Sequence, residues 1–159
     1  MSKKSINLTT KNHNPLGKET KYEFTKPDPK ILYAIDNPNK DLDYSIKLSC
    51  PEFTSICPIT SQPDFAHIII DYVPKSKMIE SKSLKIYLHS YRNHGAYHED
   101  CTIKIAKDII STINPKWLRI SGFWYPRGGI PIDVFYEYGD LPKKIFIKEN
   151  SSYQYIPRS

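Results

Sequence analysis

The pattern of apolar and polar positions changes period along the chain, and each change predicts a different element. Residues 44–48 alternate as in a half-buried strand, which we expect to end at Cys50-Pro51 because proline cannot donate to a sheet. Residues 66–73 are rich in β-branched side chains and predict a buried strand. Residues 51–63 contain three prolines and predict a loop, a common location for chemistry.

After Pro74 the apolar residues recur every three or four positions, which is typical of one face of a helix. The first such stretch is expected to end at Gly95 and the second at Asn114-Pro115. Their apolar residues are Leu84, Tyr87, Leu88 and Tyr91, then Ala106, Ile109, Ile110 and Ile113. The pattern therefore predicts two consecutive helices.

Period two returns in residues 118–124 and 130–138, which predict a hairpin with Pro126-Arg127-Gly128-Gly129 as its turn. This order of elements predicts an α+β fold, an antiparallel sheet with both helices on one face. Residues 1–30 are polar without a sustained period and predict an extended or mobile N-terminal arm, so residues 31–159 form the single domain. Open sheet edges favour an oligomer.

The composition limits the class of protein and the cellular compartment that we expect. A chain of 159 residues with 39% hydrophobic and 25% charged residues has the balance of one globular domain. The apolar stretches are much shorter than the roughly 20 residues of a membrane helix, and we read no secretory signal, so a cytoplasmic protein is expected. Three cysteines make a disulfide framework improbable and leave at least one free thiol to explain.

The net charge of +6 suits an anionic partner, either nucleic acid or the phosphates of a nucleotide. Charge alone does not choose between them. The lysines are concentrated at the two ends of the chain, where solvated termini explain them as well.

Cys57 lies in the proline-bounded loop rather than in an apolar periodic segment. A thiol at a loop end becomes a nucleophile when its pKa falls, and Asp64, seven residues on, could protonate a developing anion. The alternatives are a buried, inert Cys57 and an Asp64 that bonds its own backbone in a turn.

A second cluster contains His94, His98, Glu99 and Cys101. Its spacing matches none of the common structural zinc patterns, and the chain has no CxxC. Glu99 either favours a helix N-terminus or, with His98, faces a polar ligand. A carboxylate is well suited to accept from the paired N–H donors of a guanine-like ring.

A third cluster, Glu80-Ser81-Lys82-Ser83-Leu84-Lys85, stands at a helix start, where phosphate is attracted, although a solvated helix face explains it equally. Arg127 before Gly128-Gly129 has the same ambiguity, because a tight turn needs the glycines anyway. No GxGxxG follows a strand, so a nucleotide cofactor would bind outside a Rossmann unit.

Taken together, these motifs resemble the QueF family of nitrile reductases over residues 36–139. The matching motifs are Cys50-Pro51-Glu52-Phe53-Thr54-Ser55-Ile56-Cys57-Pro58, Gln62-Pro63-Asp64-Phe65, Glu80-Ser81-Lys82-Ser83-Leu84-Lys85, His94-Gly95, His98-Glu99-Asp100-Cys101 and Pro126-Arg127-Gly128-Gly129. The resemblance implies the tunnelling fold (T-fold) in an oligomeric barrel. It also implies that this single-domain chain assembles as a decamer of two stacked pentamers, with active sites at subunit interfaces.

The resemblance further implies NADPH-dependent reduction of 7-cyano-7-deazaguanine to 7-aminomethyl-7-deazaguanine, a step of queuosine biosynthesis for tRNA modification. Cys57 would attack the nitrile carbon to give a thioimide, Asp64 would supply a proton, and two hydride transfers from NADPH would follow. No metal, membrane or direct nucleic-acid contact is implied. The implied substrate residues are Ile79, Glu80, Ser81, His98 and Glu99, and the implied NADPH residues are Ser81, Lys82, Arg127 and Gly128.

The chain departs from the family pattern at Ile86, often Leu or Tyr, at Ser61, where Gly is common, and in residues 33–35. None of these departures removes a reacting group. Cys57 and Cys101 suggest a further hypothesis, a reversible disulfide in the absence of substrate.

Two other function classes stay open on the residues alone. A zinc-dependent cyclohydrolase with the same fold would use His and Cys ligands to activate water, but its ligands are not matched, and a metal assay separates it. A basic RNA-binding module could stack bases on the twelve tyrosines, but no RNP-like or GXXG element is present.

Overall fold

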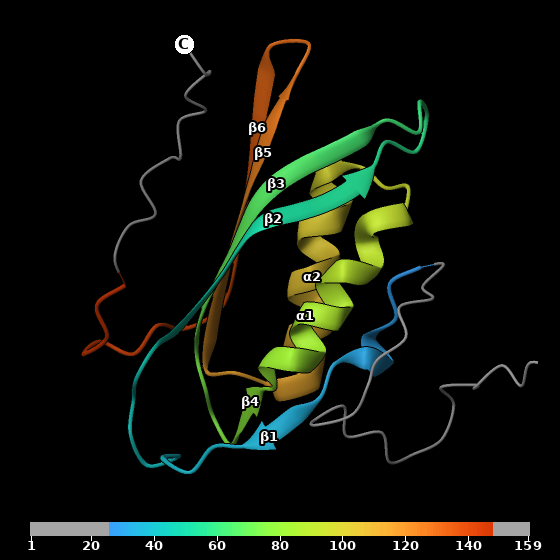
Figure 1. Cartoon of the computed structure of the whole chain (residues 1–159). Helices are drawn as coiled ribbons and strands as arrows, with labels where there is room; N and C mark the ends of the chain where they lie inside the picture. Colours follow the sequence, from blue (N-terminus) through green and yellow to red (C-terminus); the bar gives the residue numbers. More distant parts are fainter. Residues whose placement is uncertain (1–25, 148–159) are drawn as a thin grey trace, which may run out of the picture.

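A four-stranded antiparallel sheet with two helices on one face makes up most of the computed structural model, which describes residues 26–147 (Figure 1). The strand order is β2 (Ile46–Ile56), β3 (Pro63–Val73), β5 (Trp117–Arg127) and β6 (Ile130–Gly139). The helices are α1 (Ser81–His89) and α2 (His98–Ile113), and the 3-10 turns are η1 (Pro29–Ile31) and η2 (Ser90–Asn93). A separate ribbon pairs β1 (Ala34–Asp36) with β4 (Lys77–Ile79). The predicted sheet, the two helices and the hairpin are confirmed, but two predicted limits are wrong. The first helix ends at His89 and passes into η2 before Gly95, and the hairpin turn is confined to Gly128-Gly129 because β5 continues through Pro126 to Arg127.

The predicted end of the first strand at Cys50-Pro51 is wrong, because β2 continues to Ile56. Two features accommodate the proline: β2 is an edge strand, and its register with β3 shifts between Cys50 and Phe53. The loop expected over residues 51–63 is therefore confined to residues 57–62. The strands β1 and β4 were not predicted, since three residues are too few to show a period.

The hydrophobic core lies between the sheet and the helices. Alternate residues of β3 and β5 point toward it, as period two requires, and α2 packs one apolar face against them. Burying each large side chain contributes about 1.5–3 kcal/mol. Core residues include Ala66, Ile68, Ile70, Tyr72, Leu118, Ile120 and Trp124 from the sheet, and Leu84, Tyr87, Ile105, Ile109 and Ile113 from the helices. The predicted stop of α2 is confirmed by Asn114, which adopts a left-handed φ of 43°.

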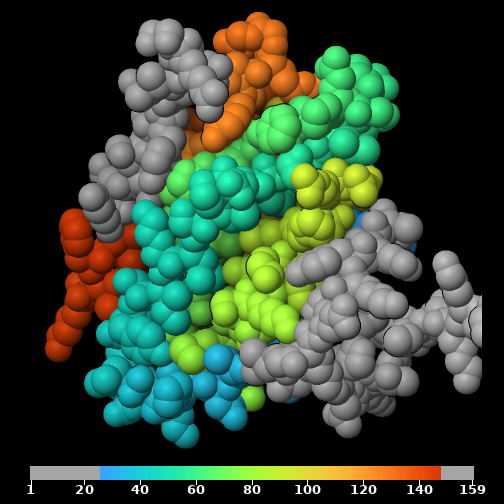
Figure 2. Space-filling model, in the orientation of Figure 1, coloured from blue at the N-terminus to red at the C-terminus, as the bar shows by residue number. Residues whose placement is uncertain are grey.

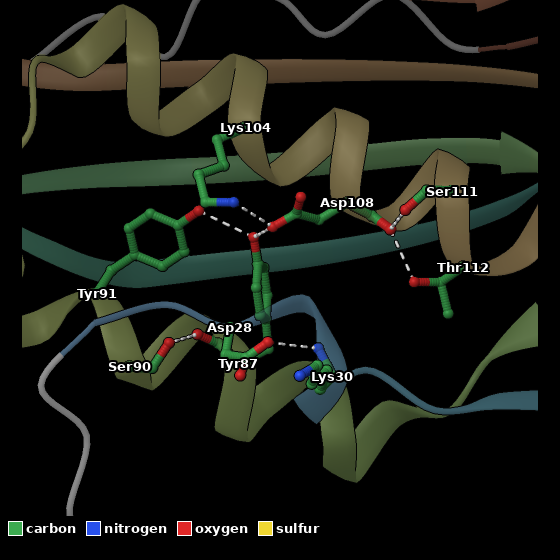
Figure 3. A network of polar contacts seen from close by, with 9 residues as sticks. All are labelled: Asp28, Lys30, Tyr87, Ser90, Tyr91, Lys104, Asp108, Ser111 and Thr112. Atoms are coloured by element: carbon green, nitrogen blue, oxygen red, sulfur yellow. Dashed lines mark hydrogen bonds and ion pairs between the residues drawn. The ribbon is translucent and has the colours of Figure 1, made fainter. Parts of the chain in front are cut away.

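A polar network ties α1 and η2 to α2 (Figure 3). The Tyr87 hydroxyl donates to Asp108 Oδ2 over 2.6 Å and lies 2.9 Å from the Tyr91 hydroxyl. Lys104 Nζ lies 2.8 Å from the same carboxylate oxygen. Burial raises the pKa of Tyr87 and of Tyr91, so both phenols stay protonated and hold η2 against α2.

The segment after η2 joins this helical layer to the end of β2. The Ile56 N–H donates to the carbonyl of His94, and the Ala96 N–H donates to the carbonyl of Ile56, each over 3.2 Å. An added Cβ on Gly95 would meet Pro58 Cα at 3.2 Å, so the two backbones approach closely. Residue 57 is thereby fixed relative to α2.

The N-terminal arm predicted for residues 1–30 lies almost wholly outside the described residues and stays a prediction. Among the residues that the structure describes, no helix is long and apolar enough to cross a membrane.

Candidate active site

Cys57 follows directly on β2 and begins a closed turn. The Cys57 N–H donates to the carbonyl of Gln62 over 2.8 Å, and the Ser61 N–H donates to the carbonyl of Cys57 over 3.0 Å. Ser61 has a φ of 57°, in the left-handed region that favours glycine, which explains why Gly suits this position in the family pattern. The turn holds the Cys57 side chain at 4% exposure.

Hydrogen-bond donors surround the Cys57 sulfur. The Thr60 hydroxyl, the backbone N–H groups of Thr60 and Ile59, and the Arg127 guanidinium together lower the pKa of the Cys57 thiol to about 6. The Thr60 nitrogen lies 3.5 Å from the sulfur. At neutral pH the thiol is therefore mostly a thiolate, the nucleophilic form.

Asp64 stands opposite Ser55 at the start of β3, and its side chain is fully buried. One oxygen, Oδ2, lies 3.3 Å from His98 Nε2 and 3.3 Å from Arg127 Nη1. The other, Oδ1, has no hydrogen-bond partner among residues 26–147, and the His98 contact lacks hydrogen-bond geometry. A buried polar atom without a protein partner keeps the capacity to bind a ligand or a water molecule.

His98 is the first residue of α2, and its ring lies flat on the indole of Trp124. The ring centroids are 4.2 Å apart and the planes differ by 9°. The Trp124 indole N–H donates to Thr102 Oγ1 over 3.1 Å, and the Thr102 hydroxyl donates to the carbonyl of His98 over 2.9 Å. The stack and these two bonds fix the orientation of the imidazole.

Trp124, Thr102 and Thr60 were not predicted as site residues. In the sequence, Trp124 belongs only to the alternating pattern of a strand and Thr102 lies in the helical pattern. Thr60 is one polar residue of a loop. The contacts that give them a role join elements distant in sequence or depend on the fold of a turn.

The structure brings together one group of the predicted residues and separates it from a second group. The tip of the β5–β6 hairpin, the turn after β2 and the start of α2 lie at the same end of the molecule (Figures 1 and 2). Glu99 is exposed beside His98 in the first turn of α2. The first group is Cys57, Asp64, His98, Glu99, Arg127 and Gly128.

The second group lies at the opposite end of the sheet, where β4 leads into α1 (Figure 1). The 11 residues of β3 separate the two ends. At about 3.3 Å per residue this corresponds to roughly 30 Å. The second group is Ile79, Glu80, Ser81 and Lys82.

Glu80 caps α1 with its own side chain. Its buried carboxylate accepts from the Lys82 N–H over 2.8 Å and from the Ser83 N–H over 2.7 Å. These backbone donors are therefore engaged, contrary to the expectation that they attract phosphate. Any phosphate at this end would therefore be contacted by the side chains of Ser81 and Lys82, while the Glu80 carboxylate keeps lone pairs for further donors.

All three cysteines are free thiols. Cys101 is buried, and burial raises its pKa to about 12, so it is a protonated, unreactive thiol in this state. The proposed disulfide between Cys57 and Cys101 stays a hypothesis. Within residues 26–147, no group of three His, Cys, Asp or Glu side chains could hold a metal ion.

Comparison with known proteins shows the family. The family model described as QueF-like protein matches residues 63–143. An NADPH-dependent 7-cyano-7-deazaguanine reductase of Bradyrhizobium sp. (strain BTAi1) is 50% identical and aligns over 99% of both chains. One of Rhodopseudomonas palustris (strain BisA53) is 55% identical over 84% of this chain and 82% of its own.

A solved structure has a similar fold. The apo form of the archaeosine synthase QueF-Like superimposes with a TM-score of 0.57 at 22% identity, over 62% of this chain and 96% of that one. The family model and the two reductases establish that the chain belongs to the QueF-like protein family.

Proposed function

We propose that this protein reduces the nitrile of 7-cyano-7-deazaguanine to the aminomethyl group with two molecules of NADPH, in the cytosol, for queuosine biosynthesis. The observation that carries the proposal is that Arg127 interacts with both a thiol of lowered pKa, Cys57, and the buried carboxyl group of Asp64. The names of relatives about 50% identical over nearly the whole chain support the same reaction.

The Cys57 thiolate adds to the nitrile carbon, so a C–S bond forms and one C–N π bond breaks. Asp64 gives a proton to the nitrogen, and the product is a thioimide. NADPH, when bound, supplies a hydride to this carbon and a second hydride after Cys57 has left as a thiolate. Two hydrides and two protons thus convert the nitrile into the amine, and the Cys57 thiolate is regenerated.

His98 and Glu99 hold the deazaguanine ring beside Cys57. The stack on Trp124 fixes the imidazole, and the exposed Glu99 carboxylate can accept from the paired N–H donors of the ring. Ile79, Glu80 and Ser81 complete the substrate site.

The residues assigned to NADPH fit a phosphorylated ligand. Arg127 has a side chain 39% exposed at the hairpin tip, and Gly128 exposes its backbone there with a φ of 58°. Ser81 and Lys82 add a hydroxyl and an ammonium group at the start of α1. These groups suit phosphate oxygens and would hold NADPH from two sides.

A complete site requires a second copy of the chain. The two groups of residues lie at opposite ends of one sheet, roughly 30 Å apart, and a purine-sized ligand cannot touch both. The edge strands β2 and β6 offer backbone groups for pairing between copies. These observations support a homo-oligomer with sites at subunit interfaces, and the resemblance to the family is the basis for proposing a barrel-shaped decamer of two stacked pentamers.

The decisive experiment mixes the protein with 7-cyano-7-deazaguanine, without NADPH, and measures the intact mass. The wild type gains one substrate mass and Cys57→Ala gains none, because only the thiolate forms the thioimide. An absence of mass gain in the wild type refutes the proposed reaction.

Mixed oligomers test the shared site. Cys57→Ala and Lys82→Ala are each expected to be inactive or nearly so. When their subunits are exchanged at a 1:1 ratio, about a quarter of the sites should regain activity, because about a quarter of the interfaces combine an intact Cys57 from one chain with an intact Lys82 from its neighbour. If exchange, confirmed by tagged subunits, restores no activity, both groups belong to one chain and the interfacial site is wrong.

A further inference from the structure

We propose that Thr60 is a catalytic residue whose hydroxyl, with the backbone of its turn, stabilises the Cys57 thiolate as nucleophile and again as leaving group. This inference deepens the proposed function and rests on it. It assigns to the turn of residues 57–62 the role of an anion-binding cage around the sulfur.

The turn places Thr60 against the sulfur, and the Thr60 hydroxyl is one of the donors to it. Thr60 Oγ1 accepts from the Gln62 N–H at 3.4 Å, and the hydroxyl hydrogen is left for the thiolate, to which it donates. The Thr60 nitrogen stands 3.5 Å from the same sulfur. One residue thus supplies two donors, and the hydroxyl is the one that a substitution can remove.

The turn is held independently of Thr60. The Cys57 N–H to Gln62 carbonyl bond, at 2.8 Å, and the Ser61 N–H to Cys57 carbonyl bond, at 3.0 Å, are both between backbone groups. Thr60 itself is exposed. Removing its hydroxyl therefore changes the surroundings of the sulfur without opening the core.

Arg127 cannot replace this donor. Its guanidinium also contacts Asp64, 3.3 Å away, and its side chain is 39% exposed, so solvent screens its charge. The Thr60 hydroxyl belongs to the same turn as the thiol and moves with it.

The reaction needs a stable thiolate twice. Cys57 attacks the nitrile as a thiolate, and after the first hydride transfer the C–S bond breaks and its electron pair returns to the sulfur. A donor aimed at the sulfur lowers the free energy of the thiolate in both steps. Without the Thr60 hydroxyl the pKa of Cys57 is higher, so thioimide formation is slower at pH values below that pKa. Departure of the Cys57 thiolate after the first hydride transfer is also slower.

The test measures the rate of Cys57 alkylation by iodoacetamide against pH in the wild type, Thr60→Val and Thr60→Ser. Thr60→Val keeps the shape but lacks the hydroxyl, and its midpoint is expected about one pH unit higher, the order contributed by one hydrogen bond to an anion. Thr60→Ser keeps the hydroxyl and the wild-type midpoint. Thr112→Val, a matched substitution at the far end of α2, leaves the midpoint unchanged.

A Thr60→Val midpoint equal to that of the wild type overturns the proposal. Circular dichroism confirms folding, and Thr60→Ala replaces Thr60→Val if the latter does not fold. Alkylation needs neither substrate nor NADPH, so this result is independent of the thioimide measurement. If the alkylation midpoint of Thr60→Val is shifted but the wild type forms no thioimide, the proposed reaction is refuted and the role of Thr60 in stabilising the thiolate stands.

Discussion

Gly122 of β5 lies directly under the first turns of α2, where a methyl group has no room. A Cβ at this position would stand 2.6 Å from Thr102 Oγ1 and 3.1 Å from Trp124 Nε1. These atoms form the hydrogen bond that anchors the indole under His98. Gly122→Ala therefore forces α2 away from the sheet at the point where the helix carries a site residue.

The magnitude follows from two contributions. Overpacking costs about 1–3 kcal/mol, and loss of the Trp124 to Thr102 hydrogen bond adds about 1 kcal/mol. The free energy of unfolding is expected to fall by about 2–4 kcal/mol. For a chain of this size the melting temperature falls by roughly 4–16 °C. Displacement of His98 also lowers kcat/KM, since misplacement by about 1 Å can cost about a hundredfold.

A double-mutant cycle with Thr102→Ala isolates the clash. Thr102→Ala alone leaves the Trp124 indole N–H without its partner and costs about 1–3 kcal/mol. In the double variant both Thr102 atoms that clash are gone, so the loss of stability is smaller than the sum of the single losses by at least about 1 kcal/mol. Urea unfolding at one fixed protein concentration measures all four proteins, because association shifts apparent stability. Additive losses would refute the packing argument.

Three further predictions follow from single contacts. Asp64→Asn is expected to lower kcat about 10²- to 10⁴-fold, because an amide cannot replace the acid that donates the proton. If the variant keeps more than about a tenth of the wild-type activity in steady-state assays, Asp64 is not the acid. Ser61→Gly raises the free energy of urea unfolding by about 0.5–1 kcal/mol, because φ at this residue is 57°; a loss would contradict the strain. Tyr87→Phe lowers that free energy by about 1.5–3 kcal/mol because Asp108 loses a donor, and an unchanged urea midpoint would show that Lys104 satisfies the carboxylate alone.

The sequence predicted those parts of the fold whose pattern is long or local. Both helices span two or more turns of apolar repeats, and the stop at Asn114 depends only on that residue and its neighbour. That the segments carrying Cys57 and Asp64 lie side by side was also predictable, because a short turn between antiparallel strands brings its two ends together.

The rest depends on contacts between distant residues. Whether a strand continues through Pro51 depends on its place at the sheet edge, which no local pattern encodes. The stack of His98 on Trp124 joins a helix to a strand 26 positions later in the chain, and Thr102 has a role only because both are in place. Residue type alone could not indicate these three partners.

The motifs assign residues to one site without saying which copy of the chain supplies them. The thiol end carries a thiol of lowered pKa, the buried carboxyl group of Asp64 and a fixed imidazole, which suit the proposed bond-making step. The α1 end carries Ser81 and Lys82 beside a helix start already capped by Glu80, which suits binding. In isolated subunits, substitutions at Lys82 should therefore leave alkylation of Cys57 unchanged, since the donors to the sulfur come from the turn and hairpin of its own chain. Under the proposed interfacial site, only the reduction of the substrate requires both ends, so Lys82→Ala should abolish turnover while it leaves the alkylation of Cys57 unchanged.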